Sequence, residues 1–423
     1  MRKLGAYPIY LLLSGTLSLG NSMLWAVETV YLVNAVGLNP VQIVLVGTVL
    51  LCVNLIFQTP TGILADMYSR RLAVVVGLFV LGVGHIVEGA QASYLAVLAG
   101  TVIGAFGGTI VSGADAAWIA DELGAERVGN AYLRAAQMGA LAGLPGIALG
   151  AVLGSMRLNV PILLSGCVFI ALGLVLLLVM PEEHFTPADR ADRTARQHMR
   201  HTLHAGVRLI RLRPALLTIL GIAVCASVFS SAFDRLWGYY LLAHFTFPTS
   251  GGLTVVVWWG IIEASIHVAN LCGTEIARRR IDWENRRSLI WGLFAVDALT
   301  LVFVVGFTVA GQLGPALGLF WLTAVSRSPR GALETTWMNL DLDSSVRATV
   351  FSIREQTGAL AGIVAGPLLG ALATDRGTGV ALIASAAALA PALVLYRRSL
   401  VRGGPLSPPS EALTPVPKGQ PER

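Results

Sequence analysis

Two long apolar segments of this chain are joined by the stretch Gly62-Ile63-Leu64-Ala65-Asp66-Met67-Tyr68-Ser69-Arg70-Arg71. Gly62 has no side chain and permits another helix to approach closely. Asp66 ends the first apolar segment, where its charge can face the positive N-terminus of a neighbouring helix. Arg70 and Arg71 favour a cytoplasmic position, because cytoplasmic loops of membrane proteins carry an excess of basic residues. The stretch therefore predicts a cytoplasmic turn between two membrane-spanning helices.

The composition of the whole chain excludes a water-soluble domain. Of 423 residues, 55% are hydrophobic and 13% are charged, whereas soluble domains are about 25% charged. A membrane-spanning helix needs roughly 20 apolar residues, so the chain has room for about twelve. Lys3 and Lys418 are the only lysines, and neither belongs to the Gly-Lys pair of a Walker A loop. We therefore expect a membrane protein that neither hydrolyses ATP nor binds nucleic acid.

The apolar segments alternate with basic loops in the manner of a multi-pass membrane protein. The predicted helices cover 6–35, 41–65, 72–92, 94–120, 128–154, 158–180, 214–245, 252–277, 288–310, 313–339, 346–374 and 378–396. With both termini in the cytoplasm, the outer loops hold only Arg157 and Arg376, and nearly all other basic residues lie in cytoplasmic segments. The sequence predicts this topology in an inner or plasma membrane.

An internal repeat relates the two halves of the chain. Residues 118–143 and 337–362 align without a gap, and both begin with Trp and end with the block Gly-Ala-Leu-Ala-Gly. The same alignment places Asp115 on Glu334. Convergent use of small residues in membrane helices is the alternative explanation, but five consecutive identities favour duplication.

Duplication predicts two parallel, pseudo-symmetric six-helix bundles, because each half has an even number of spans. The expected domains are an N-terminal bundle over 1–180, a basic cytoplasmic linker over 181–213, a C-terminal bundle over 214–396 and a disordered cytoplasmic tail over 397–423.

The stretch 62–71 resembles the loop signature G-x-L-A-D-R-x-G-R-R/K of the Major Facilitator Superfamily, with Met67 and Ser69 as departures. The resemblance implies an all-α fold of twelve transmembrane helices whose two bundles rock around a central site for a small-molecule substrate. In the family, the aspartate that corresponds to Asp66 docks on the start of the eleventh helix, here near 344–346, and closes the cytoplasmic side. The resemblance also implies a transporter without an enzymatic site.

A narrower resemblance concerns the direction of transport. Residues 112–122 are similar to the end of helix 4 in the twelve-span drug:proton antiporters of the macrolide and tetracycline efflux type. Residues 139–150 and 358–370 resemble the glycine and proline pattern of antiporters in the superfamily. The buried arginine that many drug antiporters carry on helix 4 is missing here. The resemblance implies efflux of a drug-like compound, and thus multidrug resistance, in exchange for protons.

Charged residues within the predicted spans are candidates for proton coupling. We count Glu28, Asp115, Asp234, Glu263, Asp297, Glu334, Glu355, Arg134, Arg235, Arg327, Arg330 and Arg354. Each would cost roughly 2.5–3.5 kcal/mol at the centre of a bilayer, so we expect them to pair or to line a wet cavity. The acids outnumber the arginines, and an unpaired, partly desolvated acid can bind and release a proton near neutral pH.

Family architecture places the first, fourth, seventh and tenth helices around the cavity. Glu28, Asp115, Asp234 and Glu334 are therefore the first candidates for binding protons or substrate. Glu28 has no basic residue nearby in the sequence and leads for protonation, with a hydrogen-bonded structural carboxylate as the alternative. Glu334 can pair with Arg330, which stands four residues earlier on the same helix.

Two further pairs have candidate roles. Glu263 and His267 are four residues apart and form either a proton relay or a plain buried hydrogen bond. Arg134 and Arg354 lie near the inner ends of their helices, where we expect them to form salt bridges that close the cytoplasmic gate.

Aromatic residues cluster on the first and seventh predicted helices. Trp25, Tyr31, Trp237 and Tyr240 suit a site for a bulky apolar ligand, and an interfacial aromatic belt is the alternative. We find no spacing typical of a metal site and expect no cofactor.

Our interpretation is a monomeric secondary transporter in the lipid bilayer that exports a small lipophilic compound by proton antiport. A proton-coupled importer of a nutrient or metabolite is the first alternative. A membrane sensor or scaffold on the same fold, without transport, is the second.

Overall fold

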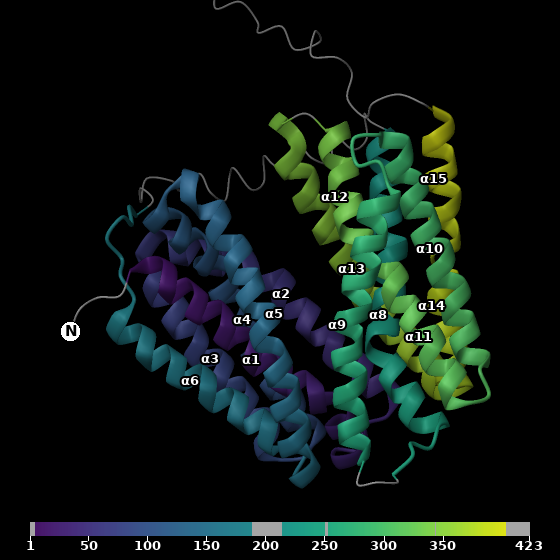
Figure 1. Ribbon diagram of the computed structural model, residues 1–423, viewed down its shortest axis with the longest axis horizontal. Coiled ribbons are helices and arrows are strands. Elements are labelled where there is room, and N and C mark those ends of the chain that lie inside the picture. Colours follow the sequence, from purple (N-terminus) through teal and green to yellow (C-terminus); the bar gives the residue numbers. More distant parts are fainter. Residues whose placement is uncertain (1–4, 188–213, 250–252, 343, 403–423) are drawn as a thin grey trace, which may run out of the picture.

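A computed structural model describes residues 5–187, 214–249, 253–342 and 344–402, and this part of the chain is built from helices (Figure 1). Most of the predicted linker and nearly all of the predicted tail lie outside the described residues. The start of the predicted tail is helical, because the last helix continues to Arg402. The domain bounds otherwise remain a prediction.

The helices follow the predicted order of apolar segments. The first half contains α1 (Ala6–Val30) with the π-helical turn η1 (Tyr31–Ala35), α2 (Pro40–Tyr68), α3 (Arg70–Ala90), α4 (Tyr94–Leu123), α5 (Ala125–Met156) and α6 (Val160–Val179). The second half contains α8 (Pro214–His244), α9 (Val255–Arg280), α10 (Arg286–Val309), α11 (Leu313–Arg327), α12 (Arg330–Asp341), α13 (Ser344–Arg376), α14 (Thr378–Ala387) and α15 (Ala390–Arg402).

These helices make twelve membrane crossings. Ten helical stretches of the described chain, with α14 and α15 taken together, have the length and hydropathy of a membrane span. The other two crossings are α1, which is more polar because of its serines and asparagine, and the consecutive pair α11 and α12. The predicted all-α fold of twelve transmembrane helices is thereby confirmed.

Two predicted helices are each broken into two. The segment predicted over 313–339 stops at Arg327 and resumes at Arg330, on either side of Pro329. The segment predicted over 378–396 breaks ahead of Pro391. Proline lacks a backbone N–H and its ring collides with the preceding turn, so the helix is interrupted at both places.

The two halves repeat one pattern of helix packing. In the first half, α1 packs on α5, α2 on α4, and α3 on both α4 and α6. In the second half, the matching pairs are α8 with α13, α9 with α11, and α10 with α11, α14 and α15. This repetition confirms the pseudo-symmetry predicted from the internal repeat.

Contacts between the halves concentrate toward one end of the molecule. The most extensive are those of α2 with α13 and of α5 with α9, and α1 with α9 and α2 with α8 also meet. Gly370 lies beside Val41 and Val44, and Gly260 lies beside Ala151. In Figure 1 the two groups of helices approach each other near the start of α9 and diverge toward the end of α12. If the predicted topology holds, the diverging end is the cytoplasmic one and the arrangement is inward-open.

Candidate functional site

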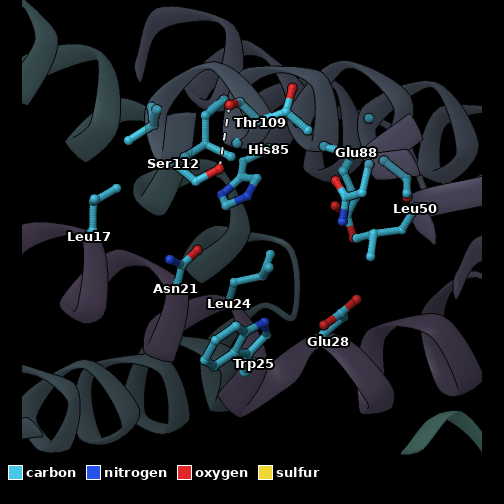
Figure 2. A pocket seen from close by; sticks show the side chains of 18 of the residues that line it. Leu17, Asn21, Leu24, Trp25, Glu28, Leu50, His85, Glu88, Thr109 and Ser112 are labelled. Carbon is cyan, nitrogen blue, oxygen red and sulfur yellow. Dashed lines mark hydrogen bonds between the residues drawn. The ribbon is translucent and has the colours of Figure 1, made fainter. Parts of the chain in front are cut away.

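A cavity of about 550 Å³ lies among α1, α2, α3 and α4. Its wall includes Trp25 and Glu28 of α1, Glu88 of α3 and Asp115 of α4, and it is completed by Arg235 of α8 from the other half of the molecule. Figure 2 shows Glu28, Glu88 and Trp25 around this space. The cavity therefore joins charged groups that are far apart in the sequence.

Small residues bring the acidic groups to the cavity wall. A side chain added at Gly100 of α4 would begin 2.7 Å from the Cβ atom of Glu88, so α3 and α4 meet closely at this point. A side chain at Gly113 would begin 3.3 Å from the Cα atom of Gly62, which brings α2 and α4 together beside Asp115. The missing side chain that admits this contact is that of Gly113, because a Cβ atom at Gly62 itself would meet nothing within 4 Å. The predicted role of Gly62 in close helix approach is therefore not seen.

The three cavity carboxylates have no ion-pair partner within 4.0 Å among the described residues. Glu88 is only 6% exposed, and within the described chain its carboxylate takes part in no hydrogen bond. Asp115 accepts a hydrogen bond from the adjacent backbone N–H of Ala116 at 2.6 Å. A cavity with three acids and one arginine in its described wall has an excess of negative charge.

Arg235 reaches the first half of the molecule by crossing α2 at a glycine. A side chain at Gly47 would begin 2.5 Å from Nε of Arg235, so this crossing needs a residue without a Cβ atom. Arg235 also borders a cavity of about 270 Å³ beside α13 and one of about 220 Å³ that includes Glu28 and Glu263. One cation of the second half therefore faces acids of the first.

Asp234 and Glu334 of the second half are paired, in contrast to the acids of the cavity. Asp234 binds Arg327 of α11 at 2.7 Å. Glu334 binds Arg354 at 2.8 Å and Arg330 at 3.0 Å. The expected pairing of Glu334 with Arg330 is present, and Asp234 has a partner that the sequence did not indicate.

Two further acids of this half belong to the same network, whereas Glu263 of α9 has no ion pair among the described residues. Asp297 binds Arg330 at 2.9 Å and accepts a hydrogen bond from the hydroxyl of Tyr396 at 2.8 Å. Glu355 binds Arg354. Arg354 thus forms ion pairs with two acids of its own half. Among the described residues it makes no salt bridge to the first half.

The internal repeat explains why Asp115 differs from Glu334. In the alignment of the two halves, Val111 and Ala135 stand where the second half has Arg330 and Arg354. The carboxylate is retained in the first half, and both of its arginine partners are replaced by apolar residues.

Glu88 was missed in the sequence analysis. It lies within the predicted span 72–92, so the count of twelve charged residues was too low. The signal was present, because Glu88 follows His85 by one helical turn in an otherwise apolar segment. His85 is buried, lines the same cavity and lies 2.9 Å from the hydroxyl of Ser165.

The loop residues that were expected to form the cytoplasmic latch interact within the first half. Asp66 binds Arg70 at 2.8 Å, and Arg70 also binds Asp121 at the end of α4. Arg71 donates to the backbone oxygen of Leu177 at 2.6 Å. The expected docking of Asp66 on the eleventh helix is not seen, because the inner ends of the two halves are apart in this state (Figure 1).

Two expected pairs are not formed. Arg134 is exposed and donates a hydrogen bond to Gln137 at 3.3 Å, and among the described residues it makes no gate salt bridge. Glu263 lines the cavity of about 220 Å³. His267 is exposed and forms no hydrogen bond with Glu263 in the described structure. The two side chains are therefore not hydrogen-bonded to each other here, and the relay stays a prediction.

The four aromatic candidates divide into two kinds. Trp25 is 53% exposed and borders the cavity, and Trp237 stacks on Trp259 with ring centres 5.0 Å apart at the rim of a smaller one. Tyr31 donates to the backbone oxygen of Glu88 at 2.9 Å and is buried. Tyr240 is buried in the same way. Both tyrosines pack the interior, and the tryptophans remain candidates for ligand contact.

Neither a metal site nor an intramolecular disulfide is present in the described structure. No group of three or more His, Cys, Asp or Glu side chains within these residues is placed to hold an ion. The four cysteines are free.

Twelve membrane helices in two repeated bundles around an internal polar cavity define a secondary transporter fold. A search with family models matches residues 10–366 to the Major Facilitator Superfamily, so the chain belongs to this family. A search of curated protein sequences found no match. The predicted family is confirmed, and the narrower efflux type remains a hypothesis.

Solved structures with the same fold are distant in sequence. A bacterial homologue of the human lysosomal transporter Spinster, in an inward-facing and unoccupied conformation, has a TM-score of 0.68 at 14% identity over 94% of this chain and 96% of its own. The nucleoside transporter NupG has a TM-score of 0.73 at 12% identity over 95% and 100%. A POT family transporter in complex with 5-aminolevulinic acid has a TM-score of 0.68 at 14% identity over 93% and 95%.

Proposed function

We propose that this protein exports a small lipophilic compound in exchange for protons by alternating access. The observation that carries the proposal is the set of carboxylates without ion-pair partners, Glu28, Glu88 and Asp115, on one cavity of the described structure. Carboxylates in a partly dry site bind either protons or a polar ligand. Competition between the two for the same groups is the physical basis of antiport.

Arg235 connects the charge of this cavity to the conformation of the molecule. It belongs to α8 and faces acids of α1 and α3 across α2. A rocking motion of the halves changes the position of this cation relative to those acids. Proton or substrate occupancy and the orientation of the transporter then influence each other through one electrostatic interaction.

The cell membrane, cytoplasmic termini and monomeric state are part of the same proposal. They are supported by the distribution of basic residues along the sequence and by the parallel halves of the fold. A thermal-shift screen of the purified protein against a chemically broad library would identify candidate substrates.

The first prediction concerns proton coupling. Replacement of Glu28 by Gln removes a titrating group from the cavity, and we expect efflux driven by a pH gradient to fall at least tenfold in reconstituted vesicles, while counterflow without a gradient persists. Pyranine fluorescence inside the vesicles reports proton movement together with substrate flux. Unchanged coupling in the Glu28→Gln variant would remove this residue from the mechanism.

The direction of transport is tested in vesicles of known orientation. An acidic exterior corresponding to the outside of the cell is expected to drive substrate out of the cytoplasmic compartment. Accumulation in the opposite direction would establish proton symport and the import alternative. The absence of any flux with bound substrate would favour a sensor.

A further inference from the structure

Negative charge is unequally divided between the two halves of this transporter. Each half has a cavity of similar size, about 550 Å³ in the first and about 540 Å³ in the second. The second is bordered by Asp234, Arg327 and Arg330, whose charged groups are in ion pairs. The first is bordered by three acids and Arg235. Of these two cavities, the first is therefore the one that presents acids without ion-pair partners among the described residues. Glu263 of α9 is a further such acid, and it borders a smaller cavity together with Glu28.

The environment of Glu88 indicates that water does not fully solvate this excess negative charge. Its side chain is more than nine-tenths buried and points into the cavity (Figure 2). In the described structure its carboxylate has neither an ion pair nor a hydrogen bond. A buried carboxylate that lacks partners is costly and is retained where a ligand or proton completes it.

The position of Asp115 adds an independent observation. The repeat-equivalent Glu334 is neutralised by two arginines, at 2.8 Å and 3.0 Å. The first half has Val111 and Ala135 at the arginine positions. This half thus keeps the carboxylate at the cavity wall without the cations that would satisfy it.

The rest of the wall suits an aromatic ligand with one polar end. Trp25 exposes half of its surface next to the acids, and aromatic faces attract cations. Asn21, Asn54 and Gln58 add amide groups that orient a ligand by hydrogen bonds. The volume lies within the range of about 300–1,000 Å³ typical of small-molecule sites.

We infer that the transported compound is an organic cation, an amine or quaternary ammonium attached to an aromatic ring, whose charge lies between Glu28 and Glu88 and whose ring contacts Trp25. Asp115 stands 15 residues beyond Gly100 on α4, where α4 packs on Glu88, and is therefore too far along the cavity to contact the same ammonium group. This inference rests on the proposed transport function and names the chemical class of its substrate.

Three probes that share one ring test the inference. They are 1-naphthylmethylammonium, the neutral 1-naphthylmethanol and the anionic 1-naphthoate. Binding is measured on the full chain in phosphatidylcholine nanodiscs, with empty nanodiscs subtracted. We expect the cation to bind at least tenfold more tightly than the alcohol, which corresponds to about 1.4 kcal/mol, and the carboxylate to bind most weakly. Equal binding of cation and alcohol, stronger binding of the carboxylate, or no binding of the cation would overturn the inference.

Variants locate the cation. Glu88→Gln and Glu28→Gln are expected to reduce the preference for the cation over the alcohol at least fivefold each, whereas Glu126→Gln, an exposed acid in the first turn of α5, leaves it unchanged. A preference that persists in both cavity variants would place the cation elsewhere and contradict the assignment. If Glu88→Gln does not fold, Glu28→Gln and the unmodified protein still decide the result.

The binding experiment is independent of proton coupling. Loss of the cation preference with intact proton-driven flux would overturn only the substrate class. An intact cation preference without proton-driven flux would overturn only the antiport proposal.

Discussion

Asp115 and Glu334 show how one residue type acquires two roles in a duplicated molecule. Both carboxylates occupy equivalent places in the repeat. Glu334 is buried and bound by Arg330 and Arg354, and Asp115 borders the cavity without an ion pair in the described structure. The first arrangement neutralises the carboxylate by ion pairs, and in our proposal the second keeps a carboxylate available for binding.

A second prediction compares these two positions by neutral substitution. Glu334→Gln leaves two partly buried arginines without full compensation, and we expect a loss of about 3–5 kcal/mol of stability, because breaking a buried ion pair leaves an uncompensated charge. Asp115→Asn breaks no ion pair and should change stability by less than about 1 kcal/mol. Thermal unfolding in detergent measures both. Equal destabilisation would contradict the different roles of the two acids.

Side-chain partners were only partly predictable at the residue scale. Glu334 and Arg330 are four residues apart on one helix, so their pairing follows from helical geometry. Asp234 and Arg327 belong to different helices, and their contact depends on how α8 packs against α11. Glu88 was predictable from the sequence, since an acid within an apolar segment is itself the signal.

At the scale of the helices, apolar length and basic loops were sufficient to predict the order of all crossings. The breaks at Pro329 and ahead of Pro391 were not predicted, because each broken segment has the length of one continuous span. Proline within a membrane helix is also compatible with a continuous helix, as at Pro60, Pro145 and Pro367. Local packing therefore decides between a break and a continuous helix.

A third prediction concerns the crossing of α2 and α8. Gly47→Ala introduces a methyl group 2.5 Å from Nε of Arg235, and the clash should cost about 1–3 kcal/mol by overpacking or displace the arginine from the acids. We expect a lower unfolding temperature together with weaker proton coupling. The matched control is Gly108→Ala on α4, where an added Cβ atom meets nothing within 4 Å. If the two variants have the same unfolding temperature and the same proton coupling, the close contact of Arg235 with Gly47 is not important for either property.

At the scale of the molecule, the state of the transporter is defined by where its halves touch. The described contacts of α2 with α13 lie in the N-terminal part of α2, whereas Asp66 lies near its C-terminal end. The latch expected from the family motif belongs to a state in which the inner ends meet. Sequence motifs identify such contacts, but they do not indicate which state a structure shows.

A fourth prediction tests this geometry. A Cβ atom at Gly370 would lie 3.2 Å from the Cβ atom of Val44, close to the spacing of a disulfide, about 3.5–4.5 Å. In a background without the native cysteines, Val44→Cys with Gly370→Cys should cross-link under oxidation, hold the outer side closed and stop transport. Reduction should restore it, and the single-cysteine variants serve as controls. Full transport by the cross-linked protein would contradict alternating access at this contact.

The crossing of Arg235 over Gly47 makes the halves mutually dependent in evolution. A chimera that joined this N-terminal half to the C-terminal half of another superfamily member would retain the acids at positions 28 and 88 and lose the cation that faces them, unless the donor also had an arginine there. A change of the acids in one half is therefore restricted by the arginine of the other half, and exchange of single halves between family members is expected to be disfavoured.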